Sequence, residues 1–299
     1  MEARTQTRHA RAGLADDGES KERRVSVDIH PFDTATAVQA VGDGTFTGRT
    51  SDDYWNFTGP FGGATAATLL RAAMEHPRSF GTPLSFTVNF CAPVTKGEFR
   101  IAVREIRSNR STQHWSMELE QADAGITATA TAVFARRRAS WAHQAAQMPS
   151  AAAFEGLPSL PTQGMMTWMQ HYDFRFASGM PQRLGPTPNA EPASARSQVW
   201  ISERRPRPLD FLSLLAFADT FFGRIFHVRG AMIPIGSVSM TTYFHADADD
   251  LAAVGNAPVL GEADAKVFTR GFSDQTGDLW SSDGRLLATS HQIVYFRAD

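Results

Sequence analysis

The chain has 299 residues, a length that suits two domains of ordinary size better than one. Its formal net charge of −2 argues against a protein that binds nucleic acid through its overall charge. The single cysteine, Cys91, excludes an internal disulfide and an all-cysteine metal site, and it fits a reducing compartment. The absence of a run of 18 apolar residues predicts no membrane insertion. Residues 1–27 are rich in charged residues and predict a flexible tail, not a secretory signal, so we expect a cytoplasmic protein.

The first half of the chain predicts one helix followed by strands. Gly62-Gly63 opens a segment with apolar residues at helical spacing, and Pro77 ends it because the residue before a proline avoids the helical region. Four segments with strand-like patterns follow, at 85–90, 100–106, 114–121 and 126–134. Apolar and polar residues that alternate with a period of two predict an antiparallel sheet with one covered face.

The second half repeats this order. A helix is predicted from Pro208 to about Phe226, because Pro208 suits a first helical turn and an apolar stripe follows it. Strands are predicted at 166–176, 197–203, 237–245, 263–272, 275–281 and 285–296. The closing strands of the two halves resemble each other, and a turn with aspartate and glycine precedes each of them. The repeat predicts a duplicated domain.

These patterns predict an α+β fold made of two tandem hot-dog domains, in each of which an antiparallel sheet wraps around a central helix. The N-terminal domain is expected at 28–138 and the C-terminal domain at 165–299. Residues 139–164 are interpreted as a linker, with a short helix near 141–147. We expect the two halves to pack against each other as a pseudo-dimer.

Short motifs occur in a fixed order along the two halves. They are Phe61-Gly62-Gly63, Phe90-Cys91-Ala92-Pro93-Val94, Arg107-Ser108-Asn109-Arg110-Ser111, Phe217-Ala218-Asp219, Tyr243-Phe244-His245, Asp283-Gly284 and Ala288-Thr289-Ser290-His291-Gln292. Through these motifs the chain resembles the double hot-dog acyl-CoA thioesterases related to bacterial acyl-CoA thioesterase II, from about Phe46 to Arg297. The resemblance implies hydrolysis of acyl-CoA thioesters to free acid and CoA, with acyl-CoA as the partner, and a homo-oligomer.

The same resemblance implies three catalytic residues. The family orients its attacking water with an aspartate, a threonine and a glutamine, and the first and last of these match Asp219 and Gln292. The threonine position falls on Ser237, which keeps the hydroxyl group but lacks the methyl group that restricts the rotamer. The implied catalytic set is therefore Asp219, Ser237 and Gln292.

The residues themselves are compatible with this chemistry. A carboxylate such as Asp219 can act as a base or orient water. Burial of a carboxylate in an apolar run is unfavourable without a partner, which favours a functional role for Asp219. Backbone N–H groups at a helix N-terminus can stabilise an oxyanion. Glycines leave such groups open to a substrate. We therefore assign substrate binding to Phe61, Gly62 and Gly63.

Two other functions stay open at this point. A hot-dog enoyl-CoA hydratase would add water across a double bond and generally pairs an aspartate with a histidine, and no helix-start Asp-x-x-x-His is present. A non-catalytic module that binds acyl thioesters is the other, because Ser237 departs from the family pattern. The sequence lacks the Gly-x-Ser-x-Gly elbow, the P-loop and zinc-ligand spacing, so we expect no cofactor and no metal.

Overall fold

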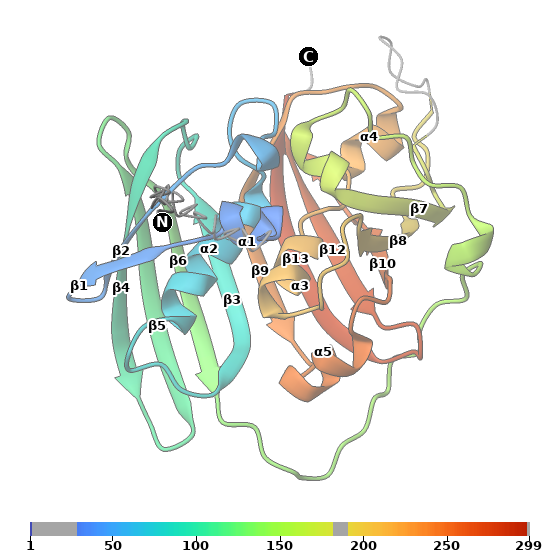
Figure 1. Ribbon diagram of the computed structural model, residues 1–299. Coiled ribbons are helices and arrows are strands. Elements are labelled where there is room, and N and C mark those ends of the chain that lie inside the picture. Colours follow the sequence, from blue (N-terminus) through green and yellow to red (C-terminus); the bar gives the residue numbers. More distant parts are fainter. Residues whose placement is uncertain (2–28, 182–190, 298–299) are drawn as a thin grey trace.

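A computed structural model describes residue 1 and residues 29–181 and 191–297. In that part of the chain, one large antiparallel sheet surrounds a small number of helices (Figure 1). No helix of the described ranges is both long enough and apolar enough to cross a membrane. Almost all of the tail predicted at 1–27 lies outside the described residues.

The first half is built around helix α2 (Gly62–Met74), which begins at the predicted glycine pair. The other elements of this half are α1 (Pro31–Ala35), β1 (Gln39–Gly42), β2 (Thr45–Arg49), η1 (Asp52–Tyr54), β3 (Thr82–Phe90), β4 (Glu98–Ser108), β5 (Thr112–Gln121) and β6 (Gly125–Ala135). The four predicted strands are confirmed as β3 to β6, while α1, β1 and β2 were not predicted. Ten of the 13 residues of α2 are buried, which confirms a central helix that is covered nearly all round.

The second half has the same kind of order with more irregular connections. Its elements are η2 (Phe154–Gly156), η3 (Thr167–His171), β7 (Tyr172–Ser178), β8 (Ser197–Glu203), α3 (Phe211–Phe217), α4 (Arg224–Arg229), β9 (Ile235–Phe244), α5 (Ala248–Val254), β10 (Val259–Asp264), β11 (Phe268–Thr269), β12 (Phe272–Trp280) and β13 (Leu286–Phe296). The prediction for β8 is confirmed with its bounds. The strand predicted at 263–272 is wrong, since this segment is divided between the end of β10, a loop and β11.

The helix predicted from Pro208 to Phe226 is also wrong, because it is broken in the middle. After α3 the backbone tightens, with Asp219 N and Thr220 N bonding to carbonyls three residues earlier, at 3.0 and 3.1 Å. The Thr220 hydroxyl donates to Phe217 O at 2.8 Å, so a side chain satisfies a carbonyl group at the end of the helix. Gly223 then begins α4 as its N-cap. Asp219 therefore lies in a turn between two short helices.

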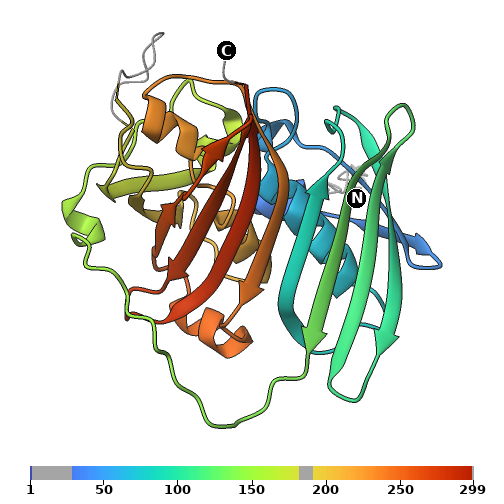
Figure 2. The same cartoon turned by 180° about the vertical axis from the view of Figure 1, so that it is seen from behind.

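The linker contains no helix at 141–147, contrary to the prediction. It runs from β6 past the lower edge of the molecule towards η2 (Figures 1 and 2). The Gln144 side chain donates to Gly284 O at 2.9 Å and accepts from Leu286 N at 2.8 Å. These two hydrogen bonds attach the extended linker to the turn between β12 and β13.

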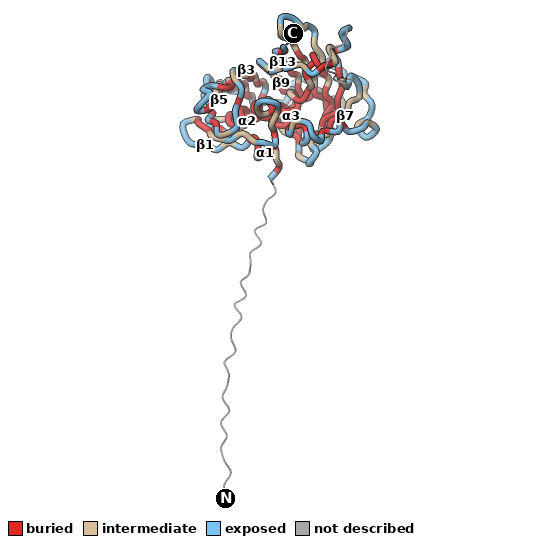
Figure 3. Tube along the Cα trace, turned by 90° about the horizontal axis from the view of Figure 1, so that it is seen from above, coloured by how far each residue is buried: buried red, intermediate tan, exposed pale blue. Residues whose placement is uncertain are grey.

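The two halves share one sheet. Its strand order is β1-β2-β4-β5-β6-β3-β9-β13-β12-β10-β8-β7, with β11 paired to β12. The halves meet where β3 and β9 pair in antiparallel register, with Thr87 opposite Thr241 and their hydroxyl oxygens 2.9 Å apart. Helices α2 and α3 pack against each other on the inner side of this sheet (Figure 1). One apolar core runs through both halves, and its buried residues gather between the sheet and the helices (Figure 3).

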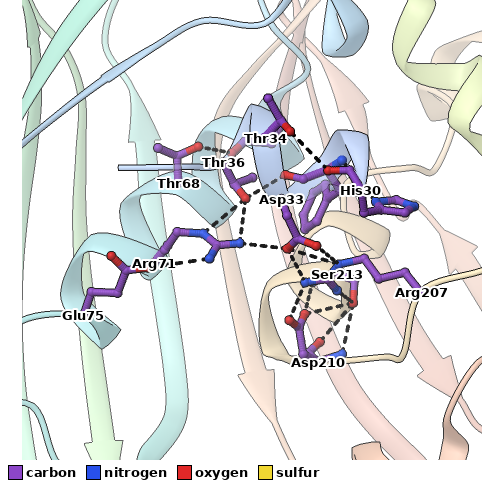
Figure 4. A network of polar contacts seen from close by, with 12 residues as sticks. His30, Asp33, Thr34, Thr36, Thr68, Arg71, Glu75, Arg207, Asp210 and Ser213 are labelled. Atoms are coloured by element: carbon purple, nitrogen blue, oxygen red, sulfur yellow. Dashed lines mark hydrogen bonds and ion pairs between the residues drawn. The ribbon is translucent and has the colours of Figure 1, made fainter. Parts of the chain in front are cut away.

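An ionic network around α1 ties the two central helices together (Figure 4). Asp33 accepts from Arg71 of α2 at 3.1 Å and from Arg207, just before α3, at 2.8 Å. Arg207 also donates to Asp210 at 2.6 Å, and Asp210 caps α3 in a reciprocal capping box with Ser213. Burial alone would raise the pKa of Asp33, but the neighbouring guanidinium groups outweigh it and lower that pKa.

Replacing Asp33 with alanine is expected to lower the free energy of unfolding by roughly 2–3 kcal/mol, because two guanidinium groups lose their shared partner. The Arg207 side chain is only 9% exposed, so water replaces that partner poorly. Urea unfolding at pH 7 measures the effect. Because the pKa of Asp33 is lowered in the fold, its contribution is present above the unfolded pKa and is lost as the pH falls through the folded pKa.

The matched control is Asp52→Ala, since Asp52 and its partner Lys96 are both largely exposed. Such a pair contributes little to stability. Equal unfolding free energies for Asp33→Ala and Asp52→Ala would contradict the role given to the network.

Candidate active site

Asp219 lies where the broken helix of the second half meets the start of α2. Gly63 N–H donates to its carboxylate. Phe61, the N-cap residue of α2, makes no side-chain capping bond. The Asp219 carboxylate, which comes from the other half of the chain, lies at this helix N-terminus instead. A Cβ atom built on Gly62 would lie 2.7 Å from Asp219 Oδ2. The two predicted glycines and the predicted aspartate are therefore in direct proximity.

Gln292 fixes the carboxylate from the sheet side. Its Nε2 donates to Asp219 Oδ1 at 3.0 Å and lies 3.3 Å from Ala218 O and 3.2 Å from Met240 Sδ. The residue is 3% exposed and points inwards from β13. The amide of Gln292 thus holds Asp219 in one orientation.

Ser237 lies near the start of β9 on the wall of the same hollow. A register shift between Ile293 and Val294 places Ser237 opposite Val294, two residues along β13 from Gln292. Ser237 lines both of the pockets that Asp219 lines. Among the hydrogen bonds of the described residues, none joins the Ser237 hydroxyl to Asp219 or Gln292. The structure thus brings Asp219 and Gln292 into contact and places Ser237 on the strand next to Gln292, without a hydrogen bond to either of them.

Two adjoining pockets meet at Asp219 and Ser237. The inner pocket has a volume of about 660 Å³ including its opening to solvent, and most of its walls are apolar. Those walls include Phe61, Met166, Trp168, Phe221, Phe222, Phe226, Ile235 and Val294. The outer pocket, of about 980 Å³ on the same measure, runs over Gly62 and along residues 56–60 and 90–94. The arrangement joins an apolar chamber to an open groove at one carboxylate.

Close packing explains why α2 begins with glycine and an aromatic residue. The ring of Phe61 stacks on Trp168 with centroids 4.2 Å apart and planes 5° from parallel. A Cβ atom on Gly63 would lie 2.6 Å from that ring and 2.8 Å from Ala216 O. Of the three residues predicted to bind the substrate, Phe61 lines the inner pocket and Gly62 lines the outer one, while Gly63 lines neither of them.

Burial raises the pKa of Asp219 to about 7, although the hydrogen bonds from Gln292 and Gly63 N–H act to lower it. The carboxyl group keeps partial contact with the pocket, so water can reach it. A carboxylate with a pKa near neutrality combines a deprotonated fraction with appreciable basicity. The site is therefore equipped to take a proton from a bound water molecule near pH 7.

Three polar groups of the inner pocket were not predicted. The buried atoms Asn56 Oδ1, Trp168 Nε1 and Gln275 Oε1 have no hydrogen-bond partner among the described residues, and all three residues line this pocket. Asn56 lies in a segment without a periodic pattern, whereas Trp168 lies in η3, where the start of a strand was wrongly predicted. Gln275 had one usable signal, since it takes an inward position in the alternating strand β12.

The protein has a double hot-dog fold with a buried aspartate and glutamine in contact beside an apolar pocket. Comparison with known families shows to which family it belongs. A model of the acyl-CoA thioesterase N-terminal domain matches residues 51–135, and one of the acyl-CoA thioesterase C-terminal domain matches residues 142–296. The chain belongs to this acyl-CoA thioesterase family.

Solved structures agree with the fold. A conserved protein of unknown function with a hot-dog fold from Alicyclobacillus acidocaldarius is 41% identical, with a TM-score of 0.85, covering 91% of this chain and 99% of that one. A putative thioesterase II from Thermobifida fusca is 19% identical, with a TM-score of 0.76 and coverage of 91% and 99%. An acyl-CoA thioesterase II from Mycobacterium marinum is also 19% identical, with a TM-score of 0.71 and coverage of 90% and 98%. No curated protein sequence matches the chain.

Proposed function

We propose that the protein hydrolyses acyl-CoA thioesters to the free acid and CoA. The observation that carries the proposal is the Asp219 carboxylate, whose pKa of about 7 and whose position between the Gln292 amide and the start of α2 suit a general base. Family membership supports the same activity. The catalytic roles of Asp219, Ser237 and Gln292 are part of this proposal.

In the proposed mechanism, water attacks the thioester carbonyl carbon while Asp219 takes one of its protons. Gln292 keeps the carboxylate aimed at that water, and the Ser237 hydroxyl, on the neighbouring strand β9, holds the water as well. N–H groups at the start of α2 stabilise the negative charge that develops on the carbonyl oxygen. The carbon–sulfur bond then breaks, and the proton on Asp219 passes to the departing thiolate.

The two pockets divide the substrate in this proposal. The apolar chamber between Phe61 and α4 takes the acyl chain, because burial of apolar surface favours it there. The outer groove over Gly62 takes the CoA side of the thioester. Phe61, Gly62 and Gly63 lie at the junction and bind the reacting group.

The organisation of the chain belongs to the same proposal. Two domains, proposed at 28–138 and 165–299 with a linker at 139–164, are supported by the separate family matches at 51–135 and 142–296 and by the seam of β3 with β9, although the second match already begins within the proposed linker. Contact between α2 and α3 supports a pseudo-dimer of the two domains. The homo-oligomer and the cytoplasmic location stay predictions.

Release of free thiol from a panel of acyl-CoA thioesters of increasing chain length tests the activity. We expect one thiol and one carboxylic acid per thioester consumed. Crotonyl-CoA that loses its enoyl absorbance without thiol release would indicate a hydratase instead. In the described part of the chain, the groups bonded to Asp219 are the Gln292 amide and Gly63 N–H, and no histidine is among them. Calorimetric binding of thioesters without turnover would indicate the non-catalytic module.

Ser237 gives a more specific test. Ser237→Ala is expected to lower kcat about tenfold, because one hydrogen bond to the attacking water is lost. Ser237→Thr keeps the hydroxyl and is expected to stay within about threefold of the unchanged protein. Steady-state kinetics on the best thioester of the panel measure both variants. A Ser237→Ala variant as active as Ser237→Thr would show that the hydroxyl group has no part in catalysis.

A further inference from the structure

Asn56 lies at the junction of the two pockets, together with Asp219 and Ser237. Of the described residues, these three are the polar side chains that line both the inner and the outer pocket. Asp219 and Ser237 already have roles in the proposed hydrolysis, whereas Asn56 has none. A substrate that occupies both pockets must pass beside the Asn56 side chain.

A tight loop before α2 fixes the position of Asn56. The backbone N–H of Asn56 donates to Gly59 O at 2.7 Å, and Trp55 and Pro60 form an antiparallel bridge across the loop. The second half of the chain holds the same loop, because the Thr167 hydroxyl accepts from Trp55 N at 2.9 Å and donates to Trp55 O at 3.2 Å. Both halves of the chain therefore place the Asn56 side chain at the junction.

The side-chain oxygen of Asn56 lacks a donor. Asn56 Oδ1 is buried and has no hydrogen-bond partner among the described residues, although the residue as a whole is only half-buried. A buried amide oxygen without a donor is unfavourable, and an apolar side chain of similar size would avoid that penalty. An unpaired acceptor in a fixed loop that lines two pockets indicates a ligand that brings the donor.

An acyl-CoA thioester has its first such donor on the CoA side. The thioester group itself contains a carbonyl oxygen and a sulfur atom, and neither carries a hydrogen that it could donate. An unsubstituted acyl chain has no donor either. In the pantetheine arm of CoA, two methylene groups join the sulfur atom to an amide N–H. The outer pocket, which takes this arm in the proposed function, runs along residues 56–60.

We propose that Asn56 Oδ1 accepts a hydrogen bond from the amide N–H nearest the thioester sulfur atom, so that Asn56 selects pantetheine thioesters over thioesters of simple thiols. The proposal rests on the thioesterase function proposed above. It assigns a residue to recognition of the leaving group and not of the acyl chain. A thioester that lacks the N–H leaves Asn56 Oδ1 unpaired and is therefore discriminated against. Asn56 determines specificity and takes no part in bond breaking.

The test compares hexanoyl-pantetheine with an analogue in which an ester oxygen replaces the amide N–H nearest the sulfur atom. The two thioesters have the same acyl group and the same length, and only the first can donate to Asn56. We expect the unchanged protein to prefer the amide by at least tenfold in kcat/KM, because the analogue also brings an oxygen atom towards Oδ1. Release of free thiol measures both reactions.

Three variants separate the acceptor atom from the shape of the side chain. Asn56→Leu has a similar shape without an acceptor, and its ratio of kcat/KM values is expected to fall to about one. Asn56→Asp keeps an acceptor oxygen and is expected to keep the preference for the amide, whatever its overall activity. Asn256→Leu makes the first replacement at an exposed position that lines neither pocket, and it is expected to keep the ratio of the unchanged protein.

Calorimetry with the two matching thioethers, which cannot be hydrolysed, separates this proposal from the thioesterase function. Tighter binding of the amide thioether that is lost in Asn56→Leu and kept in Asn56→Asp supports the role of Asn56 even if no thioester is hydrolysed. Equal kcat/KM for the two thioesters in the unchanged protein, or an undiminished preference in Asn56→Leu, overturns the role of Asn56 alone. Loss of the preference in Asn56→Asp also overturns it. Neither hydrolysis of the thioesters nor binding of the thioethers by the unchanged protein would overturn both proposals.

Discussion

Replacing Asp219 with asparagine is expected to lower kcat for thioester hydrolysis by about 10²- to 10⁴-fold, the range for loss of a general base. Asparagine keeps the shape of the side chain but cannot take a proton from water. KM is expected to change much less, because the chamber walls stay in place. In the unchanged protein, kcat/KM is expected to rise with pH and to level off above about 7, where Asp219 is deprotonated. Thiol release measured from pH 5 to pH 9 tests both statements.

The same replacement is expected to stabilise the fold at pH 8 by roughly 2–4 kcal/mol. Burial raises the pKa of Asp219 from 3.8 to about 7, so the folded protein holds this proton more tightly than the unfolded chain. Stability is therefore lost as the pH rises from about 4 to about 7, and asparagine avoids that loss. The gain is expected to vanish at pH 4, as urea unfolding at the two pH values can show.

Asp249→Asn is the matched control, because Asp249 is exposed in the first turn of α5. It is expected to change neither kcat nor the free energy of unfolding appreciably. A flat pH profile together with full activity of Asp219→Asn would remove Asp219 from the mechanism.

The second large effect is expected from Gly62→Ala, which should lower kcat at least 100-fold. The added Cβ atom would lie 2.7 Å from Asp219 Oδ2 and 3.2 Å from the ring of Phe90, so the carboxylate must move. Misplacement of a catalytic group by about 1 Å is enough for such a loss. Gly62 lies in α2 and its φ angle is not positive, so alanine suits the backbone, and the stability is expected to change little.

Kinetics and thermal unfolding of Gly62→Ala separate a local change from a loss of the fold. Gly156→Ala is the control, because nothing lies within 4 Å of the Cβ atom that it adds. If Gly62→Ala kept its kcat, the N-terminus of α2 would not be the place where the substrate and Asp219 meet.

Local patterns were enough to predict most of the sheet. Strand β5 alternates buried and more exposed residues, β8 contains a short apolar run, and α2 begins at a glycine pair and is followed by a proline. The break after α3 could not be predicted from periodicity, because Phe221 and Phe222 continue the apolar stripe while the backbone has already turned. The sequence feature that indicates the break is Thr220, whose hydroxyl group hydrogen-bonds to a carbonyl group at the end of α3.

The candidate site was predictable only as far as the family motifs extend. Asp219 and Gln292 come from such motifs, and the structure brings them into contact. The inward position of Gln275 could be predicted from its own strand, but its place opposite Gln292 depends on the cross-strand register, which no single strand specifies. The Asp33–Arg207 pair was missed for a similar reason, since the two residues are 174 positions apart in the sequence.

The two central helices begin in opposite ways, with Asp210 and Ser213 closing the N-terminus of α3 while α2 has no side-chain cap of its own. A homodimer of one such domain would carry the same residues at both helix starts. Each start would then have to serve both as a capped helix end and as a binding site for negative charge. A fused chain escapes this symmetry. One copy can be selected for folding and the other for reactivity, so substitutions at the two helix starts are under separate selection.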